Sequence, residues 1–210
     1  MAVNEWATDA HALAYLERRA HLPRRDEAAA ELIARLPGTT RRVLDLGTGD
    51  GAILALVLDE FPQATGMAVD FSPAMLEAAR QRFAGDGRVE IVDHDLDRPL
   101  SRDWGTFDAV VSAFAIHHCT DERKRSLYAE VFDLVEPGGV FCNLEHVSSP
   151  TPALHLRFLD AIGFTPDEED PSNKLLDVET QLRWLREIGF TDVDCHWKWL
   201  ELALLAGVKP

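Results

Sequence analysis

Two acidic side chains flank a short glycine-rich segment in the first quarter of the chain. Asp45 lies two residues before the segment Gly47–Gly51 (Gly-Thr-Gly-Asp-Gly), and Asp50 lies inside it. Glycines let the backbone approach a ligand closely and adopt conformations that other residues avoid. The two carboxylates repel a phosphate and attract a cation. The residues therefore favour a site for a ligand that carries positive charge.

Histidines form a second group of candidate chemical residues. His117 and His118 are adjacent, and His146 follows Glu145. One of the adjacent pair is a candidate general base, although packing and loop hydrogen bonding explain the pair as well. A metal site is a third interpretation, but adjacent histidines chelate poorly and no third ligand stands at helical spacing. We expect no metal, keep His117 and His118 as catalytic candidates with His118 the packed one, and keep Glu145 and His146 as candidate substrate contacts.

Short apolar runs alternate with helical patterns along most of the chain. Strands are predicted at 43–46, 66–70, 88–92, 107–111, 140–147, 192–197 and 199–207. Helices are predicted at 4–20, 23–36, from 52 onward, and at 74–83, 121–135 and 178–188. This alternation predicts an α/β fold, with a parallel sheet and helices on both of its faces. Such a sheet places the glycine-rich segment at the carboxyl ends of the strands, where ligands bind.

Residues 148–176 interrupt the alternation. They contain Pro152, Pro166 and Pro171 together with the acidic run 167–170. The segment is either a lid that shapes a substrate site or a solvated connector.

Upstream of it, Pro137–Gly139 is expected to turn the chain into the fifth strand. We treat residues 1–210 as a single domain, because its length suits one domain.

The glycine-rich segment also satisfies a loose dinucleotide-binding pattern. Gly47, Gly49 and Ala52 fit that pattern, and Asp70 stands about 20 residues downstream, where an acid would bind the ribose. An NAD(P)-dependent oxidoreductase is therefore an alternative. The carboxylates of Asp45 and Asp50 argue against it, because a pyrophosphate would face like charge there.

Several motifs together resemble the class I S-adenosylmethionine (SAM)-dependent methyltransferases, in the small-molecule branch often called type 11/12/25. The motifs are Val43–Gly51, Val69–Leu76, His94–Leu96, Phe107–Ser112 and Pro137–Gly139, in the order and spacing of the family. The resemblance covers about residues 23–207. It implies a Rossmann-like, seven-stranded, mostly parallel sheet with an antiparallel C-terminal strand.

The resemblance also implies which residues bind the cofactor. The glycines would line the methionyl part of SAM, Asp45 would hold its ammonium, Asp70 its ribose hydroxyls and Asp95 its adenine amino group. The residues assigned to the cofactor are Asp45, Gly47, Thr48, Gly49, Gly51, Asp70, Phe71, Met75, Asp95, Leu96, Ser112 and Ala113. Residues 112–114 would pass close to the transferred methyl group. The helices within 1–36 would lie over the SAM site, which would bring in Trp6, Tyr15, His21, Arg24 and Arg25.

The expected activity is therefore transfer of the methyl group of SAM to a small-molecule acceptor, with S-adenosylhomocysteine as the second product. Catalysis of such an in-line displacement is largely orientation and exclusion of water. A non-catalytic SAM-binding protein is a further alternative. Residues 178–190 also resemble the C-terminal part of carboxy-SAM synthases, although similar stretches occur across ordinary small-molecule methyltransferases.

Composition limits the expected partners. Asp and Glu total 36 against 21 Lys and Arg, a formal net charge of -15, and the arginine pairs are scattered. Such a chain disfavours nucleic acids and anionic membranes, so we expect neither as a partner. The odd, widely spaced Cys119, Cys142 and Cys195 fit reduced thiols in a cytoplasmic protein. We see no signal-peptide pattern and no apolar run of the ~18 residues that a span needs, and we expect a monomer or homodimer.

Overall fold

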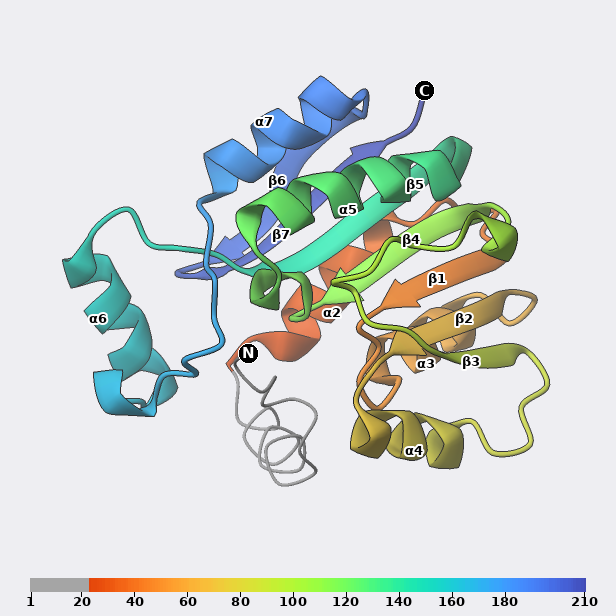
Figure 1. Ribbon diagram of the computed structural model, residues 1–210, viewed down its shortest axis with the longest axis horizontal. Coiled ribbons are helices and arrows are strands. Elements are labelled where there is room, and N and C mark those ends of the chain that lie inside the picture. Colours follow the sequence, from red (N-terminus) through yellow and green to blue (C-terminus); the bar gives the residue numbers. More distant parts are fainter. Residues whose placement is uncertain (1–22) are drawn as a thin grey trace.

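Seven strands form one mixed sheet in the computed structural model, which describes residues 23–210 (Figure 1). The strand order is β3-β2-β1-β4-β5-β7-β6, and β7 runs antiparallel to its neighbours β5 and β6. The strands are β1 (Arg42–Leu46), β2 (Thr65–Asp70), β3 (Val89–Asp93), β4 (Phe107–Ala113), β5 (Val135–His146), β6 (Thr191–Trp199) and β7 (Leu202–Val208). The predicted mostly parallel sheet with an antiparallel C-terminal strand is confirmed. The helix predicted over 4–20 lies outside the described residues.

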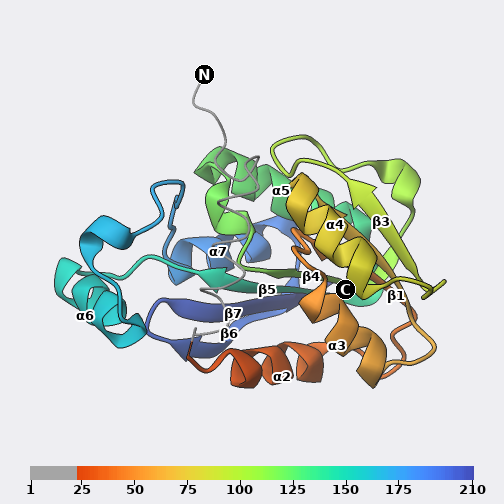
Figure 2. The same cartoon turned by 90° about the horizontal axis from the view of Figure 1, so that it is seen from below.

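Helices cover both faces of the sheet (Figure 2). On one face, α2 (Arg25–Arg35) and α3 (Ala52–Glu60) bury Leu32 and Val57 in one apolar core. On the other, α5 (Asp121–Leu134) and α7 (Val178–Ile188) bury Leu127 and Leu185 in a second core. The helix α4 (Pro73–Arg82) packs along β2 and β3. The remaining elements are the single 3-10 turns η2 (Arg102–Trp104), η3 (Ile116–His118) and η4 (Pro166–Glu168), and the helix α6 (Pro152–Ile162).

Local signals account for the agreement between predicted and observed helices. At the start of α7 the Asp177 side chain accepts a hydrogen bond from the Thr180 backbone N–H, and Gly189 follows its last residue. Both residue types are the favoured ones for these positions. Ser72 occupies the N-cap position of α4, but its side chain makes no capping hydrogen bond.

The fifth strand begins earlier than predicted. Pro137–Gly139 does not make a separate turn, because the strand starts at Val135 and runs through these residues. The pairing of β4 with β5 passes from Phe107 with Val135 to Ala109 with Val140, so the extra residues bulge from the strand. Proline has no backbone N–H to donate to a neighbouring strand, and a bulge leaves its residues unpaired, so the sheet tolerates Pro137 there.

The segment 148–176 contains a helix, α6, that the sequence analysis did not predict. Its start carries a Thr151 side chain that accepts from the Leu154 N–H, followed by Pro152, and Gly163 caps its end. These are ordinary helix-boundary signals. They were missed because the three prolines favoured an irregular segment.

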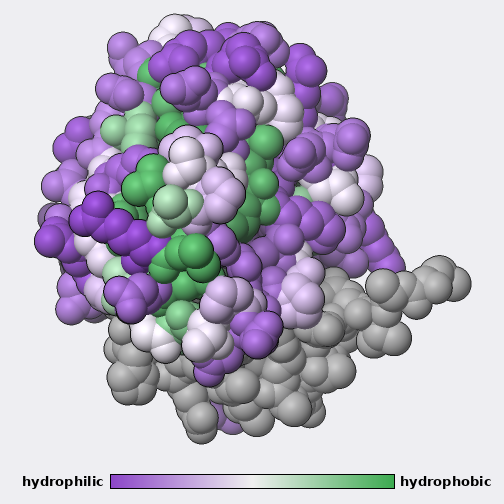
Figure 3. Space-filling model, turned by 90° about the vertical axis from the view of Figure 1, so that its left-hand side faces the viewer, coloured by the Kyte–Doolittle hydropathy of each residue, from purple (hydrophilic) through white to green (hydrophobic). Residues whose placement is uncertain are grey.

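The helix α6 lies beside the sheet and not on either of its faces (Figure 1). Phe158 and Leu159 are buried, whereas Leu154 and Leu156 are 38% and 53% exposed. Figure 3 views this side of the molecule, where apolar residues form a band among hydrophilic ones. Within residues 23–210, no helix combines the length and the apolar character needed to cross a bilayer.

Candidate functional site

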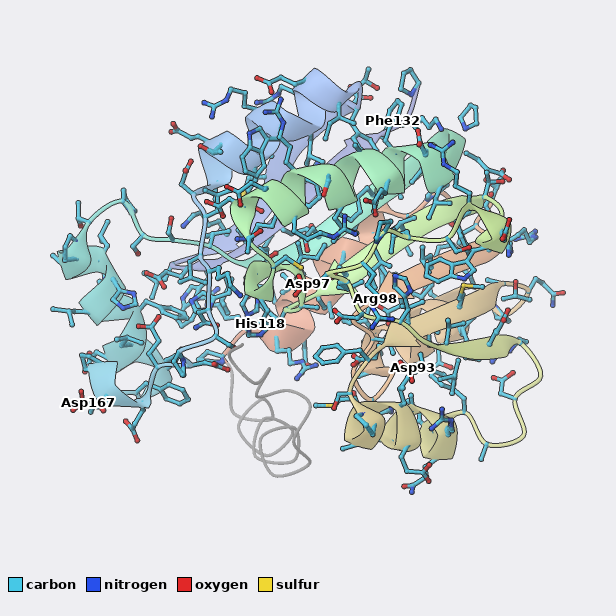
Figure 4. All side chains as sticks on the ribbon, viewed as in Figure 1. Asp93, Asp97, Arg98, His118, Phe132 and Asp167 are labelled. Carbon is cyan, nitrogen blue, oxygen red and sulfur yellow. The ribbon has the colours of Figure 1, made fainter. Side chains whose placement is uncertain are left out.

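A pocket opens at the carboxyl ends of β1, β2 and β4. Its empty space is about 880 Å³, a figure that includes space open to solvent. Figure 4 shows two of its lining residues, His118 and Asp97, close together at this end of the sheet, with Asp167 far from both. The lining residues are Arg25, Asp45, Gly47, Thr48, Gly49, Ala52, Ile53, Asp70, Phe71, His94, Asp95, Leu96, Asp97, Ala113, Phe114, Ala115, His118 and Cys119.

The backbone at Gly47 explains why the loop after β1 needs a glycine there. Gly47 has a φ of 66°, and a Cβ at this position would lie 2.2 Å from the Cβ of Ala115. A larger residue would therefore be strained and would collide with the segment after β4. The close approach of the two segments forms the floor of the pocket.

Asp45 is a buried residue in the lining of the pocket. Its Oδ2 accepts a hydrogen bond of 2.6 Å from the Thr48 hydroxyl, while its Oδ1 is buried without a hydrogen-bond partner within residues 23–210. Burial and the nearby Asp70 raise the pKa of Asp45 to about 7, although the Thr48 hydrogen bond lowers it. A buried acceptor of this kind is costly unless a donor pairs with it. It fits the ammonium group of SAM.

Asp70 holds the loops on both sides of the pocket. Its Oδ2 accepts from the Gly49 N–H at 2.9 Å, and its Oδ1 accepts from the N–H groups of Phe71 and Ser72 at 2.8 and 2.9 Å. Burial raises its pKa, while these three backbone donors lower it. The carboxylate therefore fixes the shape of the loop, and each oxygen retains limited capacity for a ligand hydroxyl.

The loop after β3 forms a third wall. The Asp95 Oδ1 accepts from the Asp97 N–H at 2.9 Å, which closes a tight turn at the pocket. The Leu96 carbonyl accepts from the Arg123 Nε at 2.5 Å. Leu96 thus lines the pocket as predicted, but its carbonyl oxygen is engaged by α5.

Three residues assigned to the cofactor from the sequence do not line the pocket. Gly51 packs against α4, since a Cβ there would lie 2.3 Å from the Phe83 ring. Met75 is buried in α4 beneath the glycine-rich loop, where its Sδ lies 3.9 Å from a Cβ built on Gly49. The Ser112 hydroxyl donates to the Leu46 carbonyl at 2.8 Å and ties β4 to β1. These residues support the pocket from behind.

The adjacent histidines have opposite environments, and the expectation that His118 is the packed one is wrong. His117 is 6% exposed, and its Nδ1 lies 2.7 Å from Oε1 of Glu145. His118 lines the pocket, and its Nδ1 lies 2.9 Å from the Ser172 hydroxyl. Burial lowers the pKa of both imidazoles, that of His118 to about 3 with a further contribution from His117, so both are neutral near pH 7.

Glu145 and His146, the predicted substrate contacts, are not among the residues that line this pocket. Glu145 is fully buried, and it accepts from the His146 backbone N–H at 2.9 Å and from the Asn143 side chain at 3.1 Å. The His146 Nε2 lies 3.1 Å from Oε2 of the buried Glu201. Both residues are held by hydrogen bonds to neighbouring protein groups, and both pair with β7 in the sheet.

Further pocket residues were not singled out by the sequence analysis. Cys119 and Ala115 lie beside His118 in the segment after β4, and Asp97 follows the predicted adenine site. Phe114, which belongs to the residues 112–114 expected near the transferred methyl group, also lines the pocket, and its φ of 56° is unusual for a residue with a side chain. The sequence could have indicated these residues only through their position directly after predicted strands, where ligands bind in such a sheet. Trp6, Tyr15 and His21, which were expected at the site, lie outside the described residues.

The pocket suits a ligand with positive charge better than a dinucleotide. Four carboxylates line it, those of Asp45, Asp70, Asp95 and Asp97, together with the cationic Arg25. SAM carries a sulfonium, an ammonium and one carboxylate, whereas NAD(P) carries a pyrophosphate. Opposite charges in a partly buried site attract strongly. The donor and acceptor set therefore fits SAM.

Comparisons with known proteins agree with this fit. A family model described as a methyltransferase domain matches residues 43–139. A demethylmenaquinone methyltransferase of Clavibacter sepedonicus is 31% identical over 192 residues, which are 83% of this chain and 76% of that protein. The structure of an O-methyltransferase family protein from Burkholderia thailandensis is 27% identical with a TM-score of 0.73, over 96% of this chain and 59% of that one.

A more distant structure, human N-acetylserotonin methyltransferase in complex with SAM, shares the fold. Its TM-score is 0.69 at 15% identity, over 98% of this chain and 57% of that one. The relative from Clavibacter and the family model extend the likeness from fold to sequence. The chain therefore belongs to the class I SAM-dependent methyltransferases.

Proposed function

We propose that this enzyme transfers the methyl group of SAM to a small molecule that carries an acidic hydroxyl group. The observation that carries the proposal is a pair of groups that line the same pocket. Asp45 offers a buried, unpartnered oxygen to a cation, and His118 offers a neutral imidazole on the wall after β4. The first suits the methyl donor and the second suits a proton-bearing acceptor.

In this proposal, different pocket residues bind different parts of SAM. Asp45 would hold the ammonium, Arg25 the carboxylate, Asp70 the ribose hydroxyls and Asp95 the adenine amino group. Phe71 would pack beside the adenine, and Ala113 would border the methyl group. When bound, SAM supplies a methyl group on a sulfonium, a strong electrophile that leaves as a neutral thioether.

His118 would act on the acceptor. Its imidazole takes the hydroxyl proton while an electron pair of the acceptor forms the new bond to the methyl carbon. The positive charge thus ends on the imidazolium, which later returns the proton to water. A general base contributes about 10²–10⁴-fold to a rate when its pKa lies near the working pH, so this role requires the pKa of His118 to rise from about 3 when the acceptor binds. His117 has no such role here, because it is buried against Glu145.

The names of the relatives narrow the acceptor class to be tested first. The relatives include demethylmenaquinone methyltransferases and a chloroplastic methyltransferase that acts on a phytyl hydroquinone. A hydroquinone has a weakly acidic hydroxyl, and loss of its proton activates both the oxygen and the adjacent ring carbon. We therefore propose a phenol or hydroquinone as acceptor.

The experiment begins with mass spectrometry of any ligand retained on purification. A screen of phenols and hydroquinones with labelled SAM follows. We expect methyl transfer to at least one of them, and His118→Ala should slow it by about 10²–10⁴-fold with near-normal affinity for S-adenosylhomocysteine. Calorimetric binding of NADH without binding of SAM would support an oxidoreductase instead. Tight SAM binding with no turnover on any acceptor would support a non-catalytic protein.

A further inference from the structure

The loop after β3, residues 95–100, forms one wall of the pocket and also contacts α5. Asp95, Leu96 and Asp97 line the pocket, and Figure 4 labels Asp97 and Arg98 in this loop. The Asp95 side chain accepts from the Asp97 N–H, and the Asp95 carbonyl accepts from the Arg98 N–H, both at 2.9 Å. These two bonds join near neighbours in the chain, so they set the shape of the turn but not its place beside the pocket.

A single guanidinium from α5 holds two carbonyls of this loop. Arg123 donates from Nε to the Leu96 carbonyl at 2.5 Å and from Nη2 to the Arg98 carbonyl at 2.8 Å. Glu130 accepts from Nη1 and Nη2 at 2.6 and 2.7 Å. Nη1 also donates to the Ser126 hydroxyl at 2.9 Å. An arginine side chain has five N–H hydrogens, and these contacts use all of them.

Glu130 adds a third attachment to the loop. Its Oε2 also accepts from the Leu100 N–H at 2.9 Å. The Arg123 and Glu130 side chains are only 12% and 25% exposed. Burial opposes the charge on each residue, but their hydrogen bonds outweigh it, so the pKa of Arg123 is raised and that of Glu130 is lowered. Both groups therefore stay ionised, and ionised partners form the stronger hydrogen bonds.

We propose that Arg123 and Glu130 are positioning residues for the cofactor, because they hold the loop after β3 where the Asp95 carboxylate accepts a hydrogen bond from the adenine amino group. Neither residue is among those that line the pocket, so both act through the loop. The inference rests on the proposed function, which assigns the adenine amino group to Asp95. A planar guanidinium can hold two carbonyls and a carboxylate at once, whereas a lysine ammonium has three hydrogens and no such plane.

A displaced loop should weaken cofactor binding selectively. If the Asp95 carboxylate moves, its hydrogen bond to the adenine amino group is lost, while the contacts of Asp45 and Asp70 with other parts of the cofactor remain. One hydrogen bond to a charged group corresponds to about tenfold or more in affinity. A nucleoside without the amino group never makes this bond, so its affinity should depend little on the position of the loop.

The test measures affinity by calorimetry with two probes, S-adenosylhomocysteine and S-inosylhomocysteine, in which a carbonyl oxygen replaces the amino group. The parent should prefer the adenine probe by about tenfold or more. Arg123→Met should bind the adenine probe about tenfold more weakly and the inosine probe within about threefold of the parent, so that the preference largely disappears. Arg123→Lys should lie between them. Arg125→Met removes an arginine of the same helix that pairs with Glu187, and this control should keep the parental affinities.

Urea unfolding and circular dichroism establish that each variant is folded. A folded Arg123→Met with the parental preference for adenine would overturn the inference. Equal losses for both probes would also overturn it, because they would indicate a general structural role, and so would a parent that binds both probes equally. If Arg123→Met does not fold, Arg123→Lys decides by the same criteria.

Asp95→Asn separates this inference from the proposed function. Its amide still accepts from the Asp97 N–H but can also donate to the inosine carbonyl, so the proposed function requires the preference for adenine to fall. If Asp95→Asn keeps the parental preference while Arg123→Met loses it, the positioning role of Arg123 holds for the loop and the assignment of Asp95 in the proposed function fails. If Asp95→Asn loses the preference while a folded Arg123→Met keeps it, the assignment of Asp95 holds and the positioning role is overturned.

Discussion

At the residue scale, the carboxylates of the pocket do two different tasks. Asp70 is occupied by three backbone N–H groups and shapes the loops, whereas Asp45 keeps one oxygen unpartnered among the described residues. The sequence assigned both to ligand binding on equal terms. The hydrogen-bond partners distinguish the two acids: those of Asp70 fix the loops, whereas one oxygen of Asp45 lacks a partner among the described residues.

The affinity for S-adenosylhomocysteine should depend on the ionisation of Asp45. Its pKa is about 7 in the free protein, and an ammonium beside it would favour the ionised form. Affinity should therefore rise with pH, by up to about tenfold per unit below pH 7, and level off above it. Calorimetry from pH 5 to 7 measures this. Asp45→Asn should bind more weakly without that slope, while Asp160→Asn, outside the pocket, should behave as the parent. A parent with equal affinity at pH 5 and 7 would contradict the pairing.

Replacement of Asp70 should disturb both loops that it holds. Asp70→Ala removes an acceptor for Gly49, Phe71 and Ser72, and hydrogen bonds to a charged group contribute roughly 1.5–3 kcal/mol each. Affinity for S-adenosylhomocysteine should fall at least about tenfold. Asp70→Asn should fall less, because its amide oxygen still accepts from Phe71 and Ser72. Calorimetry with circular dichroism to confirm folding measures this, and a folded Asp70→Ala of parental affinity would refute the assignment.

His117 should matter for stability. His117→Ala removes the 2.7 Å partner of the buried Glu145, which keeps its hydrogen bonds from the His146 N–H and the Asn143 side chain. Loss of one hydrogen bond to a charged group costs about 1.5–3 kcal/mol. Urea unfolding should show that loss, and His117→Gln, which keeps a donor, should lose less. The residual turnover of His117→Ala should follow its folded fraction. An alanine variant as stable as the parent would exclude this role.

At the scale of elements, the segment 148–176 joins the sheet through a histidine and two carboxylates. The His155 Nδ1 of α6 lies 3.0 Å from Oε1 of Glu201, and its Nε2 lies 3.3 Å from Oε2 of Glu169. Glu201 also faces His146. Both ring nitrogens therefore face acceptors, which suits an imidazolium.

The contacts of His155 with Glu201 and Glu169, which we call the His155 clamp, should stabilise the fold more at low pH. Burial lowers the pKa of His155, but Glu201 and Glu169 raise it by more, so the net pKa lies above 6.5. The stabilisation is complete below the unfolded pKa of about 6.5 and is lost as pH rises through the higher folded value. The melting temperature of His155→Gln should thus fall further below the parent at pH 6 than at pH 9. His196→Gln on β6 is the control, and a gap that grows with pH would contradict the clamp.

At the scale of the whole molecule, the net charge and the carboxylates of the pocket both disfavour strongly anionic ligands. A net charge of -15 disfavours polyanionic partners, and four pocket carboxylates disfavour a pyrophosphate. A monomeric or dimeric cytoplasmic enzyme with a small-molecule acceptor remains our proposal.

Ligand-induced stabilisation should show this selectivity. At a concentration 100 times its Kd, a ligand stabilises the folded state by about 2.7 kcal/mol. For a domain of this size that raises Tm by about 5–10 °C. We expect such a rise with S-adenosylhomocysteine and none with NADH, measured by differential scanning calorimetry. A rise with NADH alone would contradict the charge argument.

The sequence by itself determined the features that depend on neighbouring residues. Apolar runs predicted the strands, and the helical pattern over 178–188 predicted α7, which has these bounds in the structure. The glycine-rich loop between β1 and α3 and the acid at the end of β2 were likewise predictable, because a strand followed by a glycine turn and a helix is a local pattern. The family resemblance followed from the same local motifs.

Only the tertiary structure decided which of the two histidines lines the pocket. His117 and His118 are adjacent in one short turn, so no local pattern distinguishes them. Their partners, Glu145 and Ser172, come from distant parts of the chain. Glu145 likewise pairs in the sheet with Ala203 of β7, which comes from far along the sequence. Burial and hydrogen-bond direction arise from contacts between elements, and a local pattern carries no information about such contacts.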